Sequence, residues 1–304
     1  AFSMPIIQSC VFSLIALSTV ICNGGTALAQ SDPLWPQWRG ANRNNLSEET
    51  GLFETWDDDG PQEAWTATGL GSGYASISIA DGKIFTTGDD DNQQYVVALE
   101  MDGANLWKQP VTDAKPEHGY AGSRSTPTFD DGLLYVVTSA GSIVCLSAEN
   151  GAIVWQREFS QWDGEMMSVW GFSESPLVDG DRVVCSPGGV KGMVVALNKK
   201  TGDEIWACTL PDYDTEAGIN GKNLKDGAGY ASIRLSHGGG VKQYVQLVGR
   251  GLIGIRASDG ELLWRYARVS NGTANIPDAV IDGDDVFAST GYKTGAALLK
   301  LTAN

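Results

Sequence analysis

The sequence predicts an all-β protein that is built from repeated four-stranded antiparallel sheets. Glycine and tryptophan are abundant, with 38 and 10 residues among 304, while only 19% of the residues are charged. Short runs of β-branched and aromatic residues alternate with Asp-Gly or similar turns, which is the pattern of β-hairpins. One order of turns and apolar runs recurs along the chain and ends in a tryptophan. These three observations favour a β-propeller, whose four-stranded blades must stack to bury their faces.

Each copy of the repeat has the same order of elements. An inner run leads through an Asp-Gly turn into a second β-rich run, a third run follows, and a glycine-containing turn precedes the tryptophan. In the fourth copy three glycines replace the Asp-Gly turn. The complete copies span residues 77–107, 126–155, 175–206 and 238–264, and a fifth begins at 276. Their tryptophans are 48, 51 and 58 residues apart, the length of one blade. We expect each tryptophan to dock between neighbouring blades.

About five blades are present, and the two ends of the pattern are complementary. Trp65 precedes the first copy and has the features of an outer strand without inner strands, while the fifth copy stops after its third strand. Either the strand at Trp65 completes the last blade and closes five blades, or the chain is the first part of a longer propeller. The first residue is Ala1 rather than methionine, which favours a chain that is incomplete at its ends.

The first 29 residues carry no charged side chain and include an apolar run from Val11 to Ile21. A run of this length is typical of a signal peptide and too short to span a bilayer as a helix. Ala27 and Ala29 fit the small-residue rule for cleavage. We therefore assign residues 1–29 to a signal peptide, 30–61 to a lead-in and 62–304 to the propeller, and we expect a periplasmic or secreted protein without a transmembrane segment.

The net charge and the cysteines exclude several classes of function. The formal charge is −16, and a protein that binds nucleic acid needs a basic surface. Cys145, Cys185 and Cys208 are not spaced as metal or haem motifs, and all three lie in strand-like runs. Buried free thiols are the favoured interpretation, with a bridge between Cys185 and Cys208 as the alternative.

The repeat resembles that of the pyrroloquinoline-quinone-type (PQQ-like) propeller family. The resemblance is strongest where an Asn-Gly or Thr-Gly turn precedes the tryptophan, at residues 147–155 and 198–206, and it covers residues 35–304. The opening at residues 35–40 and 48–52 is similar to the lead-in of exported bacterial members, many of them from planctomycetes. The resemblance implies a seven- or eight-bladed ring. It leaves activity open, because quinoprotein dehydrogenases and non-enzymatic scaffolds share the repeat.

Quinoprotein dehydrogenases, as the resemblance implies, hold PQQ and a Ca²⁺ ion whose ligands are Glu, Asn and often Asp. The adjacent-cysteine disulfide that covers the quinone in that family has no counterpart here, and no haem-attachment motif is present. Neither a base nor a nucleophile is recognisable from a motif. We therefore name no catalytic residue, and PQQ and Ca²⁺ remain candidate cofactors.

One group of polar residues could form a ligand site. Ser125, Glu174 and Asn275 each lie two residues ahead of the proline of an inner strand. Inner strands line the central channel, so these side chains could converge there. Glu174 and Asn275 would suit a hard cation, and Arg124 and Trp170 could hold an anionic aromatic ligand. The alternative is that these residues are polar channel residues that close the ends of strands.

Two functions follow from these observations. The first is an exported binding or scaffold module that takes a protein or a small molecule on one face of the propeller. The alternative is a PQQ- and Ca²⁺-dependent oxidoreductase that resembles the alcohol dehydrogenases of the family. In the second case Glu174 and Asn275 would bind Ca²⁺, and the quinone would lie near Arg124 and Trp170. Whether the chain is an enzyme stays open at this stage.

Overall fold

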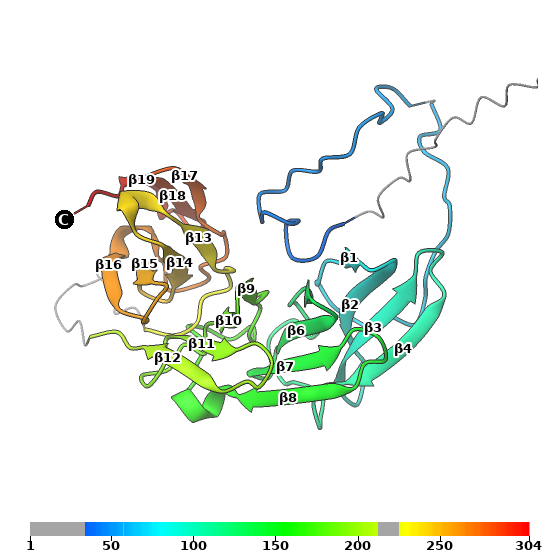
Figure 1. Ribbon diagram of the computed structural model, residues 1–304, viewed down its shortest axis with the longest axis horizontal. Coiled ribbons are helices and arrows are strands. Elements are labelled where there is room, and N and C mark those ends of the chain that lie inside the picture. The colour runs from blue at the N-terminus through cyan, green and yellow to red at the C-terminus, as the bar shows by residue number, and fades with distance from the viewer. Residues whose placement is uncertain (1–33, 57, 212–224, 304) are drawn as a thin grey trace, which may run out of the picture. The chain divides into compact units, whose positions relative to one another are not determined.

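The computed structural model describes residues 34–56, 58–211 and 225–303. In these residues nineteen strands form five antiparallel sheets, joined by loops and three short 3-10 helices. Figure 1 shows the sheets following one another in chain order, from β1 to β19. Each copy of the sequence repeat forms one sheet, so the predicted all-β fold of antiparallel blades is confirmed. The predicted signal peptide, residues 1–29, lies outside the described residues.

Every sheet begins with an inner strand of three residues, and the other strands pair in chain order. Sheets 1 and 2 consist of β1 (Ser78–Ala80), β2 (Lys83–Asp89), β3 (Gln94–Glu100), β4 (Asn105–Pro110), β5 (Thr128–Asp130), β6 (Leu133–Thr138), β7 (Ser142–Ser147) and β8 (Ile153–Glu158). Sheets 3 and 4 consist of β9 (Leu177–Asp179), β10 (Arg182–Cys185), β11 (Val194–Asn198), β12 (Glu204–Cys208), β13 (Arg234–Ser236), β14 (Gln243–Val248), β15 (Gly251–Arg256) and β16 (Leu262–Tyr266). Sheet 5 consists of β17 (Val280–Asp282), β18 (Asp285–Thr290) and β19 (Gly295–Lys300). The 3-10 helices are η1 (Phe159–Trp162), η2 (Gly238–Gly240) and η3 (Ala267–Val269).

The Asp-Gly turns between first and second strands have the backbone geometry that their sequence predicts. Asp81 and Gly82 have φ angles of 50° and 66°, and Asp131 and Gly132 have φ angles of 49° and 75°. Two successive positive φ angles match the right-handed twist of a two-residue hairpin, and Asp and Gly tolerate them better than most residues. These turns fix which residues face the core.

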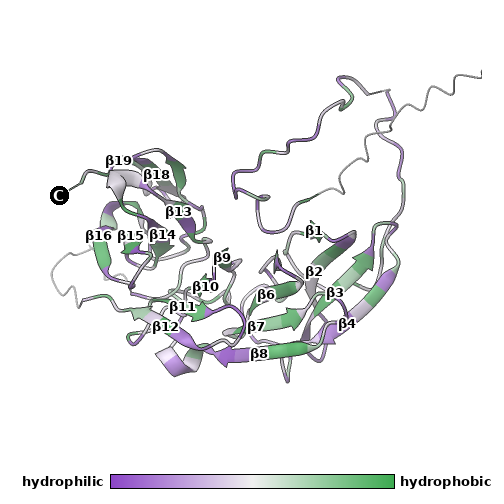
Figure 2. Cartoon of the chain, viewed as in Figure 1, coloured by the Kyte–Doolittle hydropathy of each residue, from purple (hydrophilic) through white to green (hydrophobic). Residues whose placement is uncertain are grey.

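The core lies between neighbouring sheets. The second and third strands of each complete sheet are almost wholly buried, whereas four of the six residues of β4 and three of the six residues of β8 are exposed. Figure 2 shows hydrophobic stretches in β7, β14 and β15 and a hydrophilic end on β8. Four apolar clusters each join the facing sides of two consecutive sheets. The sheets therefore stabilise one another in series, as expected for blades that cannot bury both faces alone.

The repeat tryptophans pack against a glycine of the next sheet. A Cβ atom placed on Gly151 would lie 2.7 Å from the ring of Trp107, and one on Gly202 would lie 2.7 Å from Trp155. Trp206 has the same relation to Gly260, at 2.6 Å. The prediction that these tryptophans dock between blades is therefore confirmed for three of them.

Trp65 also rests on a glycine, although its own segment is not a strand. A Cβ atom on Gly103 of sheet 1 would lie 2.5 Å from the Trp65 ring. Residues 62–69 have no assigned strand, so the outer strand expected there does not form. In the described part of the chain, β19 pairs only with β18.

A belt of hydrogen bonds connects the five sheets just before their inner strands. It involves the residue two positions ahead of each inner strand, namely Ser76, Thr126, Ser175, Ser232 and Asp278. The backbone N–H of each residue donates to the side-chain oxygen of the next one along this series, with distances of 3.1, 3.0, 3.0 and 2.7 Å. The belt brings the loops that precede the five inner strands together in space.

The three cysteines of the described region, Cys145, Cys185 and Cys208, are free and buried. The prediction of buried thiols is confirmed, and the alternative bridge between Cys185 and Cys208 is wrong. Burial raises the pKa of all three thiols, to about 12 for Cys145 and Cys208, so they remain protonated. Among the residues that the structure describes, no helix is long and apolar enough to cross a membrane.

Candidate functional site

The loops that the belt brings together enclose an aromatic pocket of about 520 Å³. Six aromatic side chains line it, from the lead-in and from loops of every sheet: Trp38, Tyr74, Tyr120, Trp170, Tyr230 and Tyr292. The pocket also includes two charged residues, Arg124 and Asp278, together with Ser173, Ser175 and Ser232. A concave, largely apolar cavity with a few fixed polar groups is the usual form of a small-molecule site.

Arg124 is held firmly at the wall of this pocket. Its Nη1 donates to the carbonyl oxygen of Gly122 at 2.9 Å and lies 3.2 Å from Nδ1 of His118. Its Nη2 donates to the carbonyls of Gly119 and Tyr120, and the guanidinium lies 5.2 Å from the centre of the Tyr74 ring. Burial lowers the pKa of Arg124 below its usual value. The side chain still presents an oriented positive charge, because its direct partners are neutral.

Aromatic rings form much of the rest of the wall. The rings of Trp170 and Tyr230 are 5.7 Å apart and tilted by 60°. Tyr120 and Tyr292 have φ angles of 54° and 57°, and both side chains are more than half exposed. A bulky residue at positive φ is uncommon and costs free energy, and such residues concentrate at functional sites. The rings can therefore meet a ligand at the mouth of the pocket.

Asp278 and Trp38 belong to the pocket but were not predicted from the sequence. Asp278 Oδ1 accepts the backbone N–H of Ser232, and its Oδ2 accepts the indole N–H of Trp38 at 3.0 Å. Arg39 Nη1 approaches the same oxygen at 3.4 Å. Asp278 lies two positions ahead of its inner strand, as Thr126 and Ser175 do. This shared position in the repeat is the sequence signal that would have identified it.

Glu174 lies close to the pocket in sequence but is directed into the protein. It is 3% exposed, and its Oε2 accepts the backbone N–H of Ser186 at 2.7 Å, while Oε1 is buried without a hydrogen-bond partner. Burial raises the pKa of Glu174 to about 8. Ser125 occupies the same register and accepts the N–H of Val137 at 3.2 Å. Each of these two side chains thus accepts the backbone N–H of the residue twelve positions later in the chain. This contact agrees with the alternative that the residues are polar groups that close the ends of strands.

Asn275 does not share this register. It lies five residues ahead of β17, whereas Ser125 and Glu174 lie three residues ahead of their inner strands. Its Oδ1 accepts the N–H of Asn271 at 2.9 Å, and its Nδ2 donates to Val248 and Gly249. The side chain is completely buried and fully used by these contacts. The structure thus places Arg124 and Trp170 in one pocket, while Glu174 and Asn275 are not among the residues that line it.

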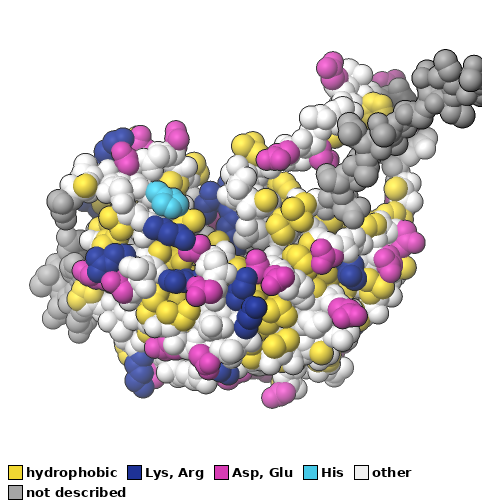
Figure 3. All heavy atoms as spheres, viewed as in Figure 1, with side chains coloured by type: hydrophobic (Ala, Val, Ile, Leu, Met, Phe, Trp, Pro, Cys, Tyr) yellow, Lys and Arg dark blue, Asp and Glu magenta, His cyan; other side chains and the backbone are white. Residues whose placement is uncertain are grey.

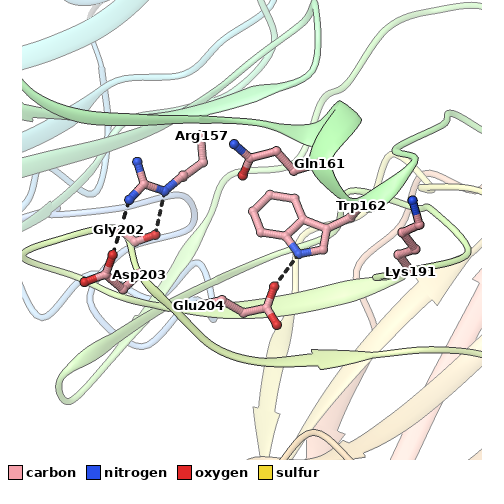
Figure 4. Close-up of a pocket in the computed structure, with 7 residues that line it drawn as sticks. All are labelled: Arg157, Gln161, Trp162, Lys191, Gly202, Asp203 and Glu204. Atoms are coloured by element: carbon pink, nitrogen blue, oxygen red, sulfur yellow. Dashed lines mark hydrogen bonds and ion pairs between the residues drawn. The ribbon is translucent and has the colours of Figure 1, made fainter.

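A second pocket of about 380 Å³ lies between the outer parts of sheets 2 and 3. Figure 4 shows Arg157 hydrogen-bonded to Gly202 and paired with Asp203, and Trp162 bonded to Glu204. Its polar groups largely bind one another, so they join the two sheets. Within the described ranges, no group of three His, Cys, Asp or Glu residues could hold a metal ion. Figure 3 shows acidic and basic side chains interspersed on the visible face.

The comparisons with known proteins agree with the fold. The chain is 27% identical over 173 residues to methanol dehydrogenase [cytochrome c] subunit 1 of Methylorubrum extorquens, covering 50% of this chain and 26% of that protein. It is 28% identical over 114 residues to outer membrane protein assembly factor BamB of Alteromonas naphthalenivorans, covering 34% and 26%. The solved structure of quinohemoprotein alcohol dehydrogenase from Comamonas testosteroni matches with a TM-score of 0.58 at 14% identity, covering 88% of this chain and 45% of that one.

These matches show similarity and leave the activity open. Each alignment with the two curated relatives spans about a quarter of the relative's length, and the structural match at 14% identity shows the fold alone. Nothing in the comparisons supports a planctomycete source. A family model described as outer membrane protein assembly factor BamB matches residues 92–303, which is more than half of the chain. The chain therefore belongs to this family of PQQ-like propeller repeats.

Proposed function

We propose that this protein is an exported binding module and that its ligand is a small, planar, anionic aromatic molecule. The observation that carries the proposal is the aromatic pocket, which is lined by six rings and one oriented guanidinium. Flat rings bind a planar ligand by stacking, and a guanidinium binds carboxylates well because its donors are planar and fixed. PQQ is a molecule of this class and is the first candidate because of the family resemblance.

The polar groups of the pocket favour an anion over a cation. Asp278 already accepts hydrogen bonds from Ser232 and Trp38 and pairs with Arg39, so its charge is largely compensated. The hydrogen-bond partners of Arg124 are neutral carbonyls and an imidazole, and the carboxylate of Asp89 favours its charge from nearby without a hydrogen bond to it. The positive charge of Arg124 is therefore the stronger attraction for a ligand in the pocket.

The side chains do not fit the Ca²⁺ site of a quinoprotein dehydrogenase. Both functional ends of the Asn275 amide are used in hydrogen bonds to the backbone, and Glu174 binds Ser186 away from the pocket. The geometry therefore supports ligand binding more strongly than oxidoreduction.

A protein partner could instead bind the face of the propeller that carries the pocket. Four exposed aromatic and aliphatic side chains of the pocket offer it an apolar surface, namely Tyr74, Tyr120, Ile276 and Tyr292. Export remains a proposal that rests on the uncharged, apolar character of residues 1–29. One relative carries the name outer membrane protein assembly factor, which agrees with a location outside the cytoplasm.

Titration of the purified protein with PQQ tests the proposal. Binding should quench tryptophan fluorescence, because Trp38 and Trp170 line the pocket. The expected result is a one-to-one complex that forms equally well with Ca²⁺ and with a chelator. No binding up to high micromolar PQQ would contradict this ligand. A complex that requires Ca²⁺ and oxidises alcohols with an added electron acceptor would support the oxidoreductase alternative instead.

A further inference from the structure

The lead-in segment between residues 35 and 45 is hydrogen-bonded to the inner ends of all five sheets. On sheet 1, Trp35 and Ile79 of β1 exchange two backbone hydrogen bonds of 2.9 Å. On sheet 2, the carbonyl of Pro36 accepts the N–H of Phe129 of β5 at 2.7 Å. The segment thus hydrogen-bonds to the middle residue of each of the first two inner strands.

Arg43 carries the contacts to sheets 3 and 4. Its guanidinium donates to the carbonyl oxygens of Ser175, Pro176 and Ile233, while its Nε donates to Gln37 within the segment at 2.8 Å. The side chain is 3% exposed. Burial lowers the pKa of Arg43 to about 10, so it remains charged at neutral pH, and Asp278 and Glu174 lie near enough to favour that charge.

Asp278 provides the contact to sheet 5, because it binds both Trp38 and Arg39 of the segment. In contrast, every residue from 44 to 56 is exposed. Arg43 is therefore the last buried anchor before a long exposed stretch. The segment between residues 35 and 45 behaves as a short peptide that is seated on the sheets.

In the side-chain contacts that anchor the segment, hydrogen-bond donors come from the segment and acceptors come from the sheets. The sheets contribute only acceptors to them, three backbone carbonyls and one carboxylate. The segment contributes only donors, two guanidinium groups and one indole N–H. These acceptors select cationic donors at the anchoring positions, because buried carbonyls and a buried carboxylate without partners would be costly.

We propose that the inner ends of the five sheets form a peptide-recognition groove, and that the chain's own segment is its resident ligand. The groove would recognise a peptide with the spacing of Trp35, Trp38, Arg39 and Arg43. Trp38 and Asp278 also line the aromatic pocket, so a peptide that replaces the resident segment also replaces one wall of that pocket. The groove shares Trp38 and Asp278 with the aromatic pocket, but its contacts at Ile79, Phe129 and Arg43 do not involve Arg124. The two proposals are therefore tested separately.

Cleavage within the exposed stretch tests the proposal without altering the groove. The full chain is prepared with the recognition sequence of a specific protease in place of exposed residues between 50 and 55, and the folded protein is cut. A fluorescent synthetic peptide of residues 34–46 is then added in excess, and its uptake is followed by anisotropy until the signal is constant. Unlabelled peptides compete: the native sequence, Arg43→Ala, and Asn42→Ala, the last as a control because Asn42 is exposed.

We expect the cut fragment to remain with the propeller during gel filtration and the labelled peptide to exchange into the groove. The Arg43→Ala peptide should compete about 100-fold more weakly, because it loses several charge-assisted hydrogen bonds. The Asn42→Ala peptide should compete as well as the native one. Loss of the fragment on cleavage with no uptake of labelled peptide would overturn the proposal. Equal competition by the Arg43→Ala and Asn42→Ala peptides would overturn it as well.

Discussion

Glu174 and Arg43 are buried ionisable side chains, and burial favours the neutral form of each. Burial raises the pKa of Glu174 from 4.5 to about 8 and lowers the pKa of Arg43 to about 10. Glu174 therefore gains a proton in the folded protein near neutral pH, whereas Arg43 keeps its charge. Their contributions to stability are correspondingly different, since one depends on pH in the neutral range and the other does not.

Glu174 should make the protein less stable as the pH rises. Between about pH 4.5 and pH 8 the folded state binds more protons than the unfolded state, so the free energy of unfolding falls with pH and levels off above pH 8. Glu174→Gln removes this dependence and still offers an acceptor to Ser186. At pH 8.5 the variant should be more stable than the wild type by roughly 2–4 kcal/mol, and at pH 5 the difference should be small.

Urea unfolding at both pH values measures this difference, with Glu48→Gln at an exposed position as the control. Parallel pH profiles for the wild type and Glu174→Gln would contradict a buried carboxyl with a raised pKa.

Arg43→Met should destabilise the protein by about 3 kcal/mol, because three backbone carbonyls lose a charged donor and a buried side chain loses its contacts. Arg256→Met is the matched control, since Arg256 pairs only with surface acids. Urea midpoints compare the two variants. A midpoint for Arg43→Met equal to that of the control would show that the lead-in contributes nothing to the fold.

Two of the residues named from the sequence lie in the same pocket. Arg124 and Trp170 were predicted as ligand-binding candidates, and both line the cavity. Asp278 was missed because the copies of the repeat were aligned on their prolines. Pro127 and Pro176 directly precede their inner strands, whereas Pro277 lies three positions ahead of β17. Strand starts, which depend on backbone pairing, place Asp278 in the same register as Ser175.

At the level of elements, the tryptophan of each outer strand and the glycine of the next turn form one packing unit. Gly151 lies against Trp107 because only a residue without a Cβ fits there, and its φ of 75° adds a second reason for glycine. Sequence spacing predicted that each tryptophan docks between blades, but it did not identify the glycine of the next turn as its contact. It could not predict the role of the lead-in, whose contacts join residues more than 100 positions apart.

A pair of glycine variants separates ring contact from backbone strain. Gly132 has the same φ of 75° as Gly151, but a Cβ there would meet nothing within 4 Å. Both alanine variants should lose stability from the positive φ, while Gly151→Ala should lose roughly 1–2 kcal/mol more because of the Trp107 ring. Thermal or urea unfolding of the two variants gives the difference. Equal losses would mean that the tryptophan does not hold the sheets together through this contact.

At the level of the whole molecule, the sheets, the belt and the lead-in all converge on one pocket. Each inter-sheet loop contributes at least one side chain to it, so its shape depends on the packing of all five sheets. The resemblance anticipated the fold and the family. The ligand depends on how loops from distant parts of the chain meet, and the order of residues does not reveal that arrangement.

The central claim is that Arg124 anchors a planar anion in this pocket. Isothermal titration calorimetry of PQQ binding to the Arg124→Met and Arg157→Met variants tests it most directly. Arg157 is the matched control, because it also donates to a backbone carbonyl but lies in the second pocket, between sheets 2 and 3. We expect Arg124→Met to bind at least about tenfold more weakly than the wild type and Arg157→Met to bind normally. Equal affinities for the two variants would contradict the account.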